Sequence, residues 1–420
     1  MAKQQEETVL LSLQDALHIA EERSYSLLAK DASAQASREL AVEASQLPDP
    51  MLQLSVDNMP LNGSMAYSLN QDFMTMRSIG ISQTFTSEAK RRARQQVFER
   101  KIDKAQTAKS LSLTEILKNT SQAWLASYYL QEIGALLASQ KHEATLQVKA
   151  AEAAYRGGRG TQSDIFLART AVAEIQDRIH QISADLDNAK TTLARWVGDT
   201  TQVVLDKAPD ISQSAFDRQH LHHLVNEHPD IALMMAEEDV AKAQAKAARQ
   251  EKHADWTWSV MYSDRGSNFS DMISIGVSVP LQWNQDNRQD RVVAANLAKA
   301  EQIRLEREEM TREHIAETER WLTTWQSNLQ RLRDYENELI PLANQRTQAA
   351  VSEYRGGSGE LADVLEARRM EIATRVENLR IEMDTAALWA ELEYLTLPST
   401  ELNHADVEST PPSNILEPKE

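Results

Sequence analysis

Four histidines lie close together near the middle of the chain, and imidazole nitrogens are common ligands of zinc and copper. They are His220, His222, His223 and His228. A metal site also needs a tight ligand spacing and a supporting further ligand, which this segment lacks. The sequence contains no Cys, so Cys-ligated zinc, thiol catalysis and disulfides are excluded. We therefore predict an exposed segment here, and no resident metal or cofactor.

Four methionines form a second candidate group, because thioether sulfur binds soft cations such as Cu(I) and Ag(I). Met59, Met65, Met74 and Met76 lie in or beside a segment that should connect two strands. Packing within this loop is the simpler interpretation, and transient contact with a metal ion is the alternative.

Sequence motifs of enzymes do not stand out. We find no nucleophile elbow, P-loop, zincin helix or paired-carboxylate cleft. The glycine-rich segments 157–160 and 356–359 do not resemble phosphate-binding loops, because no strand precedes them and no Lys-Ser or Lys-Thr follows. We predict that the chain is not an enzyme.

These glycine-rich segments belong to an internal repeat. Residues 155–169 read YRGGRGTQSDIFLAR and residues 354–368 read YRGGSGELADVLEAR, with Tyr, Arg, three Gly, Asp, Ala and Arg in register. A second pair is SIGIS at 78–82 and SIGVS at 274–278, and a weaker pair is 17–27 with 221–231. Matches in the same order indicate that the chain is a tandem duplication.

Each half predicts the same order of elements, namely a helix, two short strands, a very long helix, a glycine-rich turn and a return helix. The helices fall at 12–46, 87–155 and 161–197, and again at 217–252, 287–354 and 360–395. The predicted organisation is a tail (1–11), a first repeat (12–198) with its turn at 156–163, an equatorial linker (199–216), a second repeat (217–398) with its turn at 355–362, and a disordered tail (399–420).

The predicted strands alternate between apolar and small or polar residues. They lie at about 51–58, 77–86, 255–263 and 272–282. Period-two alternation gives each strand one apolar and one polar face. The apolar face could pack on helices, or it could face lipid while the polar face lines a wet lumen. Four strands are too few to close a channel, so the second interpretation requires several chains.

The long helices give a second geometric constraint. Residues 87–155 contain no Pro, and a helix of this length extends about 100 Å. Apolar residues recur every three or four positions, so one stripe packs against neighbours while the rest contacts water. Such a helix belongs in a coiled coil or a cylinder of helices. Pro341 should kink its counterpart in the second half.

Composition agrees with long helices and excludes other classes. Of 420 residues, 26% are charged and only 5% are aromatic, and the formal net charge is -18. Without a basic block, nucleic acid is not an expected partner. No apolar run reaches about 18 residues, the length of a membrane-spanning helix. Residues 1–8 do not form the apolar core of a signal peptide, so a signal is absent from this chain.

With the duplication, this pattern resembles the TolC family of outer-membrane efflux and secretion ducts over about 12–397. The segments 47–56 and 60–85 are most similar to its heavy-metal branch, the CzcC-like and CusC-like proteins. The resemblance implies a mainly α fold with a small β part. It also implies a homotrimer with a 12-stranded barrel in outer-membrane lipid, a 12-helix periplasmic barrel and an equatorial layer. Its partners would be a periplasmic adaptor (membrane fusion protein) and an inner-membrane pump of the resistance-nodulation-division (RND) type.

The resemblance also implies functional residues at the two turns. The turns would be periplasmic tips that dock the adaptor, through Arg156, Gly157, Gly158, Arg159, Gly160, Arg355, Gly356, Gly357, Ser358 and Gly359. The closed periplasmic gate would be formed by Asp164, Tyr354, Asp363 and Glu366. A basic residue that the family often has five positions after the Tyr is Gly359 here, which departs from the usual salt-bridge pattern. Gate carboxylates from three chains would repel one another and raise one another's pKa.

The function that follows is a passive exit duct of a tripartite efflux system, located in the outer membrane with a long periplasmic extension. Its substrates would be heavy-metal cations. An alternative is a multidrug or type I secretion duct, which the sequence barely separates from the first. An alternative of a different class is a soluble coiled-coil scaffold.

Overall fold

The computed structural model describes residues 9–199, 203–213 and 227–396. His220, His222, His223 and the predicted C-terminal tail lie outside these residues. The chain forms two compact units. The sheet unit comprises residues 29–109 and 230–310, and the hairpin unit comprises the remaining residues. The long helices α3 (Glu88–Arg156) and α7 (Gln289–Asp334) contribute residues to both units.

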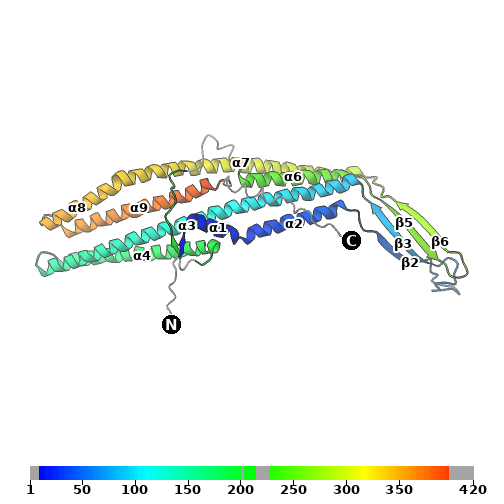
Figure 1. Ribbon diagram of the computed structural model, residues 1–420, viewed down its shortest axis with the longest axis horizontal. Coiled ribbons are helices and arrows are strands. Elements are labelled where there is room, and N and C mark those ends of the chain that lie inside the picture. Colours follow the sequence, from blue (N-terminus) through cyan, green and yellow to red (C-terminus); the bar gives the residue numbers. More distant parts are fainter. Residues whose placement is uncertain (1–8, 200–202, 214–226, 397–420) are drawn as a thin grey trace, which may run out of the picture. The chain divides into compact units, whose positions relative to one another are not determined.

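The sheet unit is named for its four antiparallel strands. They are β2 (Met51–Asp57), β3 (Met76–Phe85), β5 (Trp256–Asp264) and β6 (Met272–Ser278), and they lie side by side in the order β2-β3-β5-β6 (Figure 1). The predicted alternating segments are therefore strands. A short 3-10 helix, η2 (Gln285–Asn287), lies between the sheet and α7.

Helices α2 (Tyr25–Ser45) and α6 (Pro229–Gln250) complete the sheet unit with parts of α3 and α7. Many of the buried residues of these helices are alanines, such as Ala34, Ala105 and Ala241. Small side chains at the contacts let helices pack closely with little apolar volume, which explains the low aromatic content.

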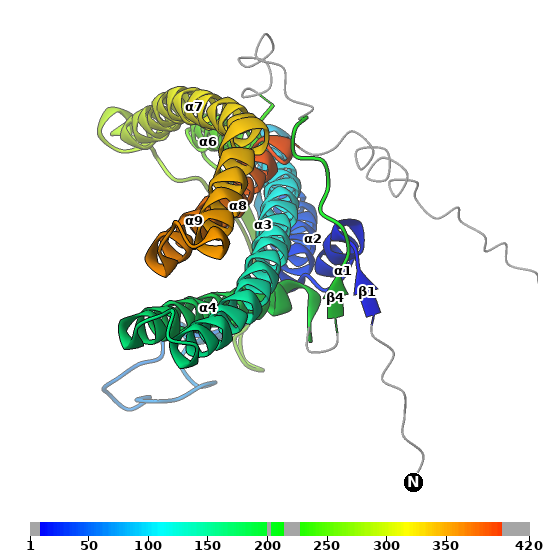
Figure 2. The same ribbon diagram turned by 90° about the vertical axis from the view of Figure 1, so that its left-hand side faces the viewer.

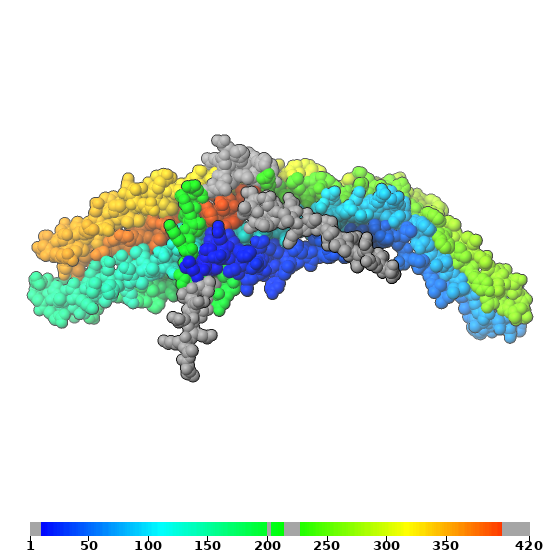
Figure 3. Space-filling view, in the orientation of Figure 1, coloured from blue at the N-terminus to red at the C-terminus, as the bar shows by residue number. Residues whose placement is uncertain are grey.

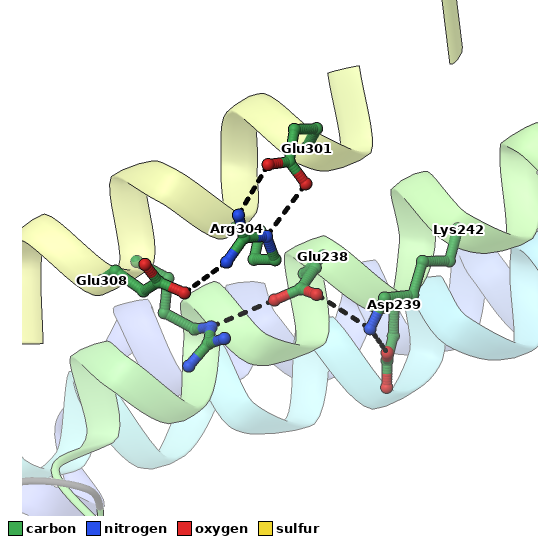
Figure 4. Close-up of polar contacts among 7 residues, drawn as sticks. Glu238, Asp239, Lys242, Glu301, Arg304 and Glu308 are labelled. Atoms are coloured by element: carbon green, nitrogen blue, oxygen red, sulfur yellow. Dashed lines mark hydrogen bonds and ion pairs between the residues drawn. The ribbon is translucent and has the colours of Figure 1, made fainter. Parts of the chain in front are cut away.

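Charged side chains supplement this thin core (Figure 4). Glu238 of α6 is 6% exposed, and its carboxylate lies 2.8 Å from Lys242 Nζ and 3.0 Å from Arg307 Nε of α7. On α7, Arg304 pairs with Glu301 at 2.6 Å and also with Glu308. The ion pair between Glu238 and Arg307 thus joins α6 to α7.

The hairpin unit consists mainly of two antiparallel helix pairs (Figure 2). The first pair is α3 with α4 (Gln162–Val197), and the second is α8 (Ile340–Gly356) with α9 (Leu361–Glu393). Its main core contains fully buried Trp124 and Leu125 of α3, Leu193 of α4 and Ala386 of α9. These are the apolar stripes that the three- and four-residue spacing predicts.

Two short strands of the hairpin unit lie in the segments predicted as tail and linker. β1 (Val9–Leu11) pairs in parallel with β4 (Val203–Leu205), so the predicted tail 1–11 is ordered at its end. Three indole N–H groups hold these segments. Trp124 donates to Leu11 O at 3.2 Å, Trp325 donates to Ile211 O at 3.2 Å, and Trp389 donates to Gln213 O at 3.0 Å.

The predicted helix 12–46 is two helices, α1 (Leu13–Glu22) and α2, with a break at Arg23 and Ser24. The Ser24 hydroxyl accepts a hydrogen bond from Leu27 N at the start of α2. α1 begins with a capping box, in which Ser12 and Asp15 each accept from the other's backbone N–H. α6 begins at Pro229, a residue well suited to the first helical position.

Pro341 disturbs the second long helix as predicted. The proline has no N–H, and its ring crowds the preceding turn. The chain forms one π-helical turn, η3 (Tyr335–Leu339), where Ile340 N donates to Tyr335 O, five residues earlier. α8 then continues to the second glycine-rich turn. No helix within the described residues has a stretch long and apolar enough to span a bilayer.

We expect Glu238→Gln to destabilise the protein by about 1–3 kcal/mol at neutral pH, because it weakens two charge-assisted hydrogen bonds. Burial alone would raise the pKa of Glu238, but the bonds from Lys242 and Arg307 outweigh it and lower the pKa from its usual 4.5. Stability from this carboxylate is therefore present above pH 4.5 and is lost as the pH falls through the folded pKa. Denaturant unfolding at several pH values measures the difference.

Glu301→Gln is the control, because Glu301 is largely exposed and pairs with Arg304 on its own helix. Its cost should stay below about 1 kcal/mol. Equal costs for the two variants would contradict a special role for Glu238.

Candidate functional site

The first glycine-rich turn joins α3 to α4. Gly158 has φ +69°, a left-handed conformation that glycine adopts without strain. Backbone N–H groups of Gly157, Gly158 and Arg159 cap the end of α3 by donating to carbonyls at 3.0 Å. α4 starts with a capping box, in which Thr161 N donates to Asp164 Oδ2 at 2.7 Å and Asp164 N donates to Thr161 Oγ1 at 3.2 Å.

The second turn joins α8 to α9 with a different start of the return helix. Gly357 is left-handed with φ +78°, and Ser358 N and Gly359 N both donate to Glu353 O at 3.1 Å. Glu360 stands at the N-cap without a side-chain cap hydrogen bond. The carboxylate of Asp363 therefore takes no part in a capping box, unlike that of its counterpart Asp164.

A small apolar cluster holds the two turns side by side. Ala151 of α3, Ala168 of α4, Leu361 and Val364 are buried together, and Tyr354 packs against them. Figure 3 shows the ends of the two hairpins, in cyan-green and in yellow-orange, next to each other. Both turns thus present their glycines on one surface of the hairpin unit. On this surface Arg156, Arg159 and Arg355 are exposed, and none has an ion-pair partner within the described residues.

A groove of about 410 Å³ runs between the α3–α4 hairpin and α9, close to the turns. Its charged lining includes Asp363, Glu366 and Arg368. Arg368 lies 3.1 Å from Glu143 of α3 and 3.4 Å from Glu371, a residue only 4% exposed. Glu371 also pairs with Arg375 at 3.3 Å. Of these pairs, the one between Arg368 and Glu143 connects α9 to α3.

The four predicted gate residues occupy three environments. Asp363 and Glu366 are exposed on the groove, and Glu366 lies 3.8 Å from Arg369. Asp363 has no hydrogen bond or ion pair within the described part of the chain. Tyr354 is half-buried in the cluster between the hairpins, and Asp164 caps α4. Of the four predicted gate residues, Asp363 is therefore the one whose side chain is least constrained by other groups of the described chain.

The sheet forms a second surface with two unlike faces. One face carries cross-strand rows of exposed apolar residues, such as Leu54, Ile79, Tyr262 and Ile273. Ile275 is 78% exposed, which is unusual for an apolar side chain in a folded protein. The opposite face carries small residues, such as the adjacent Ser55, Ser78 and Ser263. Ser78 and Ser263 share a hydrogen bond of 2.9 Å.

His228 differs from its predicted exposure. It is only 9% exposed, and its ring lies against that of His314, with centroids 4.3 Å apart and ring planes tilted by 31°. The other three histidines of that group lie in the segment that the structure does not describe.

Sequence reasoning missed a half-buried acidic site in the hairpin unit. Tyr129, Glu336 and Glu382 line an open pocket of about 520 Å³, together with residues of α7 and of the segment 210–212. Burial raises the pKa of Glu382, and the nearby Glu336 and Glu132 raise it further. Burial, with Glu382 nearby, also raises the pKa of Tyr129. Helical spacing alone places Glu382 among ordinary polar positions, so no local signal marks it.

No protein-family model matches the chain, and no curated protein matches it. Solved structures match it over nearly its full length. The crystal structure of CusC has a TM-score of 0.77 at 15% identity, covering 90% of this chain and 91% of that one. The outer-membrane protein VceC of Vibrio cholerae has a TM-score of 0.74 at 17% identity, covering 91% and 95%. The CmeC outer-membrane channel of Campylobacter jejuni has 0.76 at 11% identity, covering 94% and 89%.

The chain has the fold of these outer-membrane channels. The prediction of a mainly α, TolC-like fold with a small β part is thereby confirmed. In this channel fold the glycine-rich turns close the helical hairpins, and the sheet lies in the other compact unit. The roles of the turn residues as gate and docking surface stay predictions.

We expect Glu382→Gln to stabilise the protein at alkaline pH by roughly 1 kcal/mol or less. The folded pKa is raised, so the stability that the neutral form gives is present at low pH and is lost as pH rises through that pKa. Glutamine keeps the acceptor for Asn378, which donates to Glu382 at 2.6 Å. Thermal unfolding between pH 4 and about pH 9 should show a gain that appears only as the pH rises.

Glu377→Gln on the same helix is the control, because Glu377 is partly exposed and lies 3.6 Å from Arg331. A gain for Glu382→Gln that does not change with pH would contradict the account of burial.

Proposed function

We propose that this chain is one protomer of an outer-membrane exit duct in a tripartite efflux system. The observation that carries the proposal is the sheet, which exposes an apolar face and has a small, polar face behind it. Lipid on the first face and water on the second would satisfy both. The likeness to solved outer-membrane channels supports this arrangement through the fold.

The sheet also supports a trimer. Within the described residues, β2 and β6 each pair on one side only, and an open edge in lipid leaves backbone groups without hydrogen bonds. Three copies of four strands would close a 12-stranded barrel in outer-membrane lipid. The two helical hairpins of three chains would likewise form a 12-helix barrel that extends into the periplasm.

Aromatic residues at the strand ends fit two membrane interfaces. Phe85 and Trp256 stack at one end of the sheet with ring centroids 4.8 Å apart, and Trp283 nearby is 87% exposed. Tyr67 and Phe73 lie in the loop at the other end and are 67% and 57% exposed. Aromatic girdles of this kind flank the apolar band of transmembrane barrels.

The two glycine-rich turns would dock a periplasmic adaptor protein, which links the duct to an inner-membrane RND-type pump. Four features support docking, namely the exposed backbone, the short side chains, the adjacent position of both turns and the exposed arginines. The residues proposed for this surface are those of the two turns, 156–160 and 355–359.

Asp363 and Glu366, with Tyr354 and Asp164, would form the gate at this end. Carboxylates of three chains near the axis would repel one another, so that cations or protons favour closure. Because Asp164 is already engaged in a capping box, where its carboxylate accepts a hydrogen bond from Thr161 N and its own N–H donates to Thr161 Oγ1, we assign it a structural part in the gate.

The substrates are proposed to be heavy-metal cations. The likeness of segment 60–85 to the heavy-metal branch supports this class, and so does the match to CusC. A multidrug or secretion duct is the alternative, since VceC and CmeC match about as well. The fold itself does not discriminate between these substrates.

The main test uses purified protein in detergent and in planar bilayers. We expect trimers by native mass measurement and stepwise conductance in bilayers. Ile275→Lys should reduce insertion, because a charge on a lipid-facing strand costs about 2–4 kcal/mol at the membrane midplane. The adjacent Ser274→Lys should insert normally and change only conductance. Soluble monomers, or equal effects of the two variants, would support the scaffold alternative.

Asp363→Ala tests the gate. Removing this carboxylate should increase single-channel conductance, because alanine is smaller than aspartate at the constriction and cannot bind a cation that favours closure. Glu360→Ala is the control, since Glu360 is exposed on the same turn and does not line the groove. Unchanged conductance in Asp363→Ala would remove this residue from the gate.

Gly356→Leu tests docking. A side chain at this position is free of strain, because only Ser358 Oγ lies near its Cβ position, at 3.9 Å. The variant should lower affinity for the adaptor by about tenfold, a loss of 1.4 kcal/mol, while trimers remain intact. Surface plasmon resonance with the adaptor measures this affinity. Loss of the trimer instead would show that the turn is purely structural.

A further inference from the structure

All four methionines within the strands lie on the same face of the sheet. They are Met51 of β2, Met76 of β3, Met261 of β5 and Met272 of β6. Alternation and register place each of them on the small, polar face, because they share that face with Gln53, Ser78, Ser263 and Ser274. The apolar face contains Leu, Ile, Val and aromatic residues but no methionine.

These methionines also occupy four successive rows of the sheet. Met76 pairs with Asp57 in the first row, and Met272 pairs with Ser263 in the second. Met261 pairs with Gly80 and Ser274 in the third, and Met51 pairs with Ser82 in the fourth. Rows on one face are about 7 Å apart, so the sheet presents one thioether at each step along the strands.

Met261 and Met272 are the pair that can bind one ion together. They lie on the adjacent strands β5 and β6, one row apart, so they are diagonal neighbours. Diagonal Cα atoms are about 7–8 Å apart, within reach of long side chains. Two flexible thioethers at this separation can bring their sulfur atoms onto a single cation.

The surroundings leave these sulfur atoms accessible. On β3, β5 and β6 the other residues of this face are Ser, Thr and Gly. Gly80 opposite Met261 makes room for it, because a Cβ at Gly80 would lie 3.2 Å from Met261 Cβ. Met272 is 45% exposed and Met51 is 57% exposed. Buried packing therefore does not account for methionine at positions 51 and 272, while Met76 and Met261 are half-buried.

The chemistry favours soft, monovalent metal ions. Thioether sulfur is neutral and polarisable, and it selects Cu(I) over harder cations such as Zn²⁺ and Mg²⁺. No carboxylate lies on this face in the rows of Met261 and Met272 on β5 or β6. Two neutral sulfurs bind such an ion weakly and exchange it readily, which suits a conduit.

We propose that Met76, Met272, Met261 and Met51 form a thioether ladder for Cu(I) or Ag(I), with Met261 and Met272 as a two-sulfur site. The proposal rests on the proposed function, since a duct places this face toward its lumen. It narrows the substrate class from heavy-metal cations to soft, monovalent ones. Of the methionines that the sequence singled out, only Met76 belongs to the ladder.

Silver(I) binding to the purified trimer tests the ladder. The chain has no Cys, so any sulfur ligand seen by X-ray absorption at the silver edge comes from methionine. We expect sulfur ligation in the wild type. The double variant Met261→Leu with Met272→Leu should weaken Ag(I) binding, measured by calorimetry, by at least about tenfold. Loss of a residue that only supports a metal ligand already costs about tenfold in metal affinity, so loss of two ligands should cost at least as much. Leucine keeps the side-chain volume, so the sheet should remain folded.

Met235→Leu is the matched control, because Met235 is 50% exposed on α6 and outside the sheet. It should leave Ag(I) binding unchanged. Absence of sulfur ligands in the wild type, or unchanged binding in the double variant, would overturn the ladder. Conductance in bilayers distinguishes failure of the ladder from failure of the proposed channel function. A protein that conducts but does not bind Ag(I) would contradict the ladder alone.

Discussion

This structure depends on an antiparallel sheet that has an exposed apolar face and two edges to which no other described strand is paired. The apolar rows through Leu54 and Ile275 lie on the side opposite the serines and glycines. Water disfavours the first face, and lipid disfavours the open edges, because backbone groups there lack hydrogen bonds. Pairing of edges between copies, with lipid on the apolar face, resolves both costs together. Closure by several copies follows from this requirement and not from any single residue, whereas the proposed number of three copies is what the resemblance to the TolC family implies.

In the sheet unit, few of the buried helix residues are large and apolar, so small alanines and ion pairs hold the helices together. Glu238 and Glu371 are buried carboxylates, and each is matched by two basic groups from one or two helices. The pair between Glu238 and Arg307 joins α6 to α7, whereas both partners of Glu371 lie on its own helix α9, and breaking either set of pairs leaves a buried charge. Indole N–H groups of three tryptophans attach the connecting segments to the same helices.

Much of the fold could be predicted from the sequence because the chain is duplicated and periodic. Alternation located the strands, and the repeated Tyr-Arg-Gly-Gly segments located both turns. The pairing of Val9–Leu11 with Val203–Leu205 was missed, since three-residue strands carry no pattern.

The capping role of Asp164 and the free carboxylate of Asp363 look alike in sequence. They differ because Thr161 supplies a cap hydroxyl and Glu360 does not. Burial of Glu382 depends on the packing of three elements, which local spacing does not encode. The methionine rows, by contrast, follow from strand alternation and register.

Labelling of single cysteines in the reconstituted protein tests the two-faced sheet most directly. The chain has no native Cys, so Leu54→Cys and Gln53→Cys introduce one thiol each on neighbouring positions of β2. The account predicts that a fluorophore at position 54 is quenched by a lipid-phase quencher. A fluorophore at position 53 should be quenched only by a water-soluble one. Equal quenching at both positions, or quenching of position 54 by the water-soluble reagent alone, would contradict a sheet that separates lipid from an aqueous lumen.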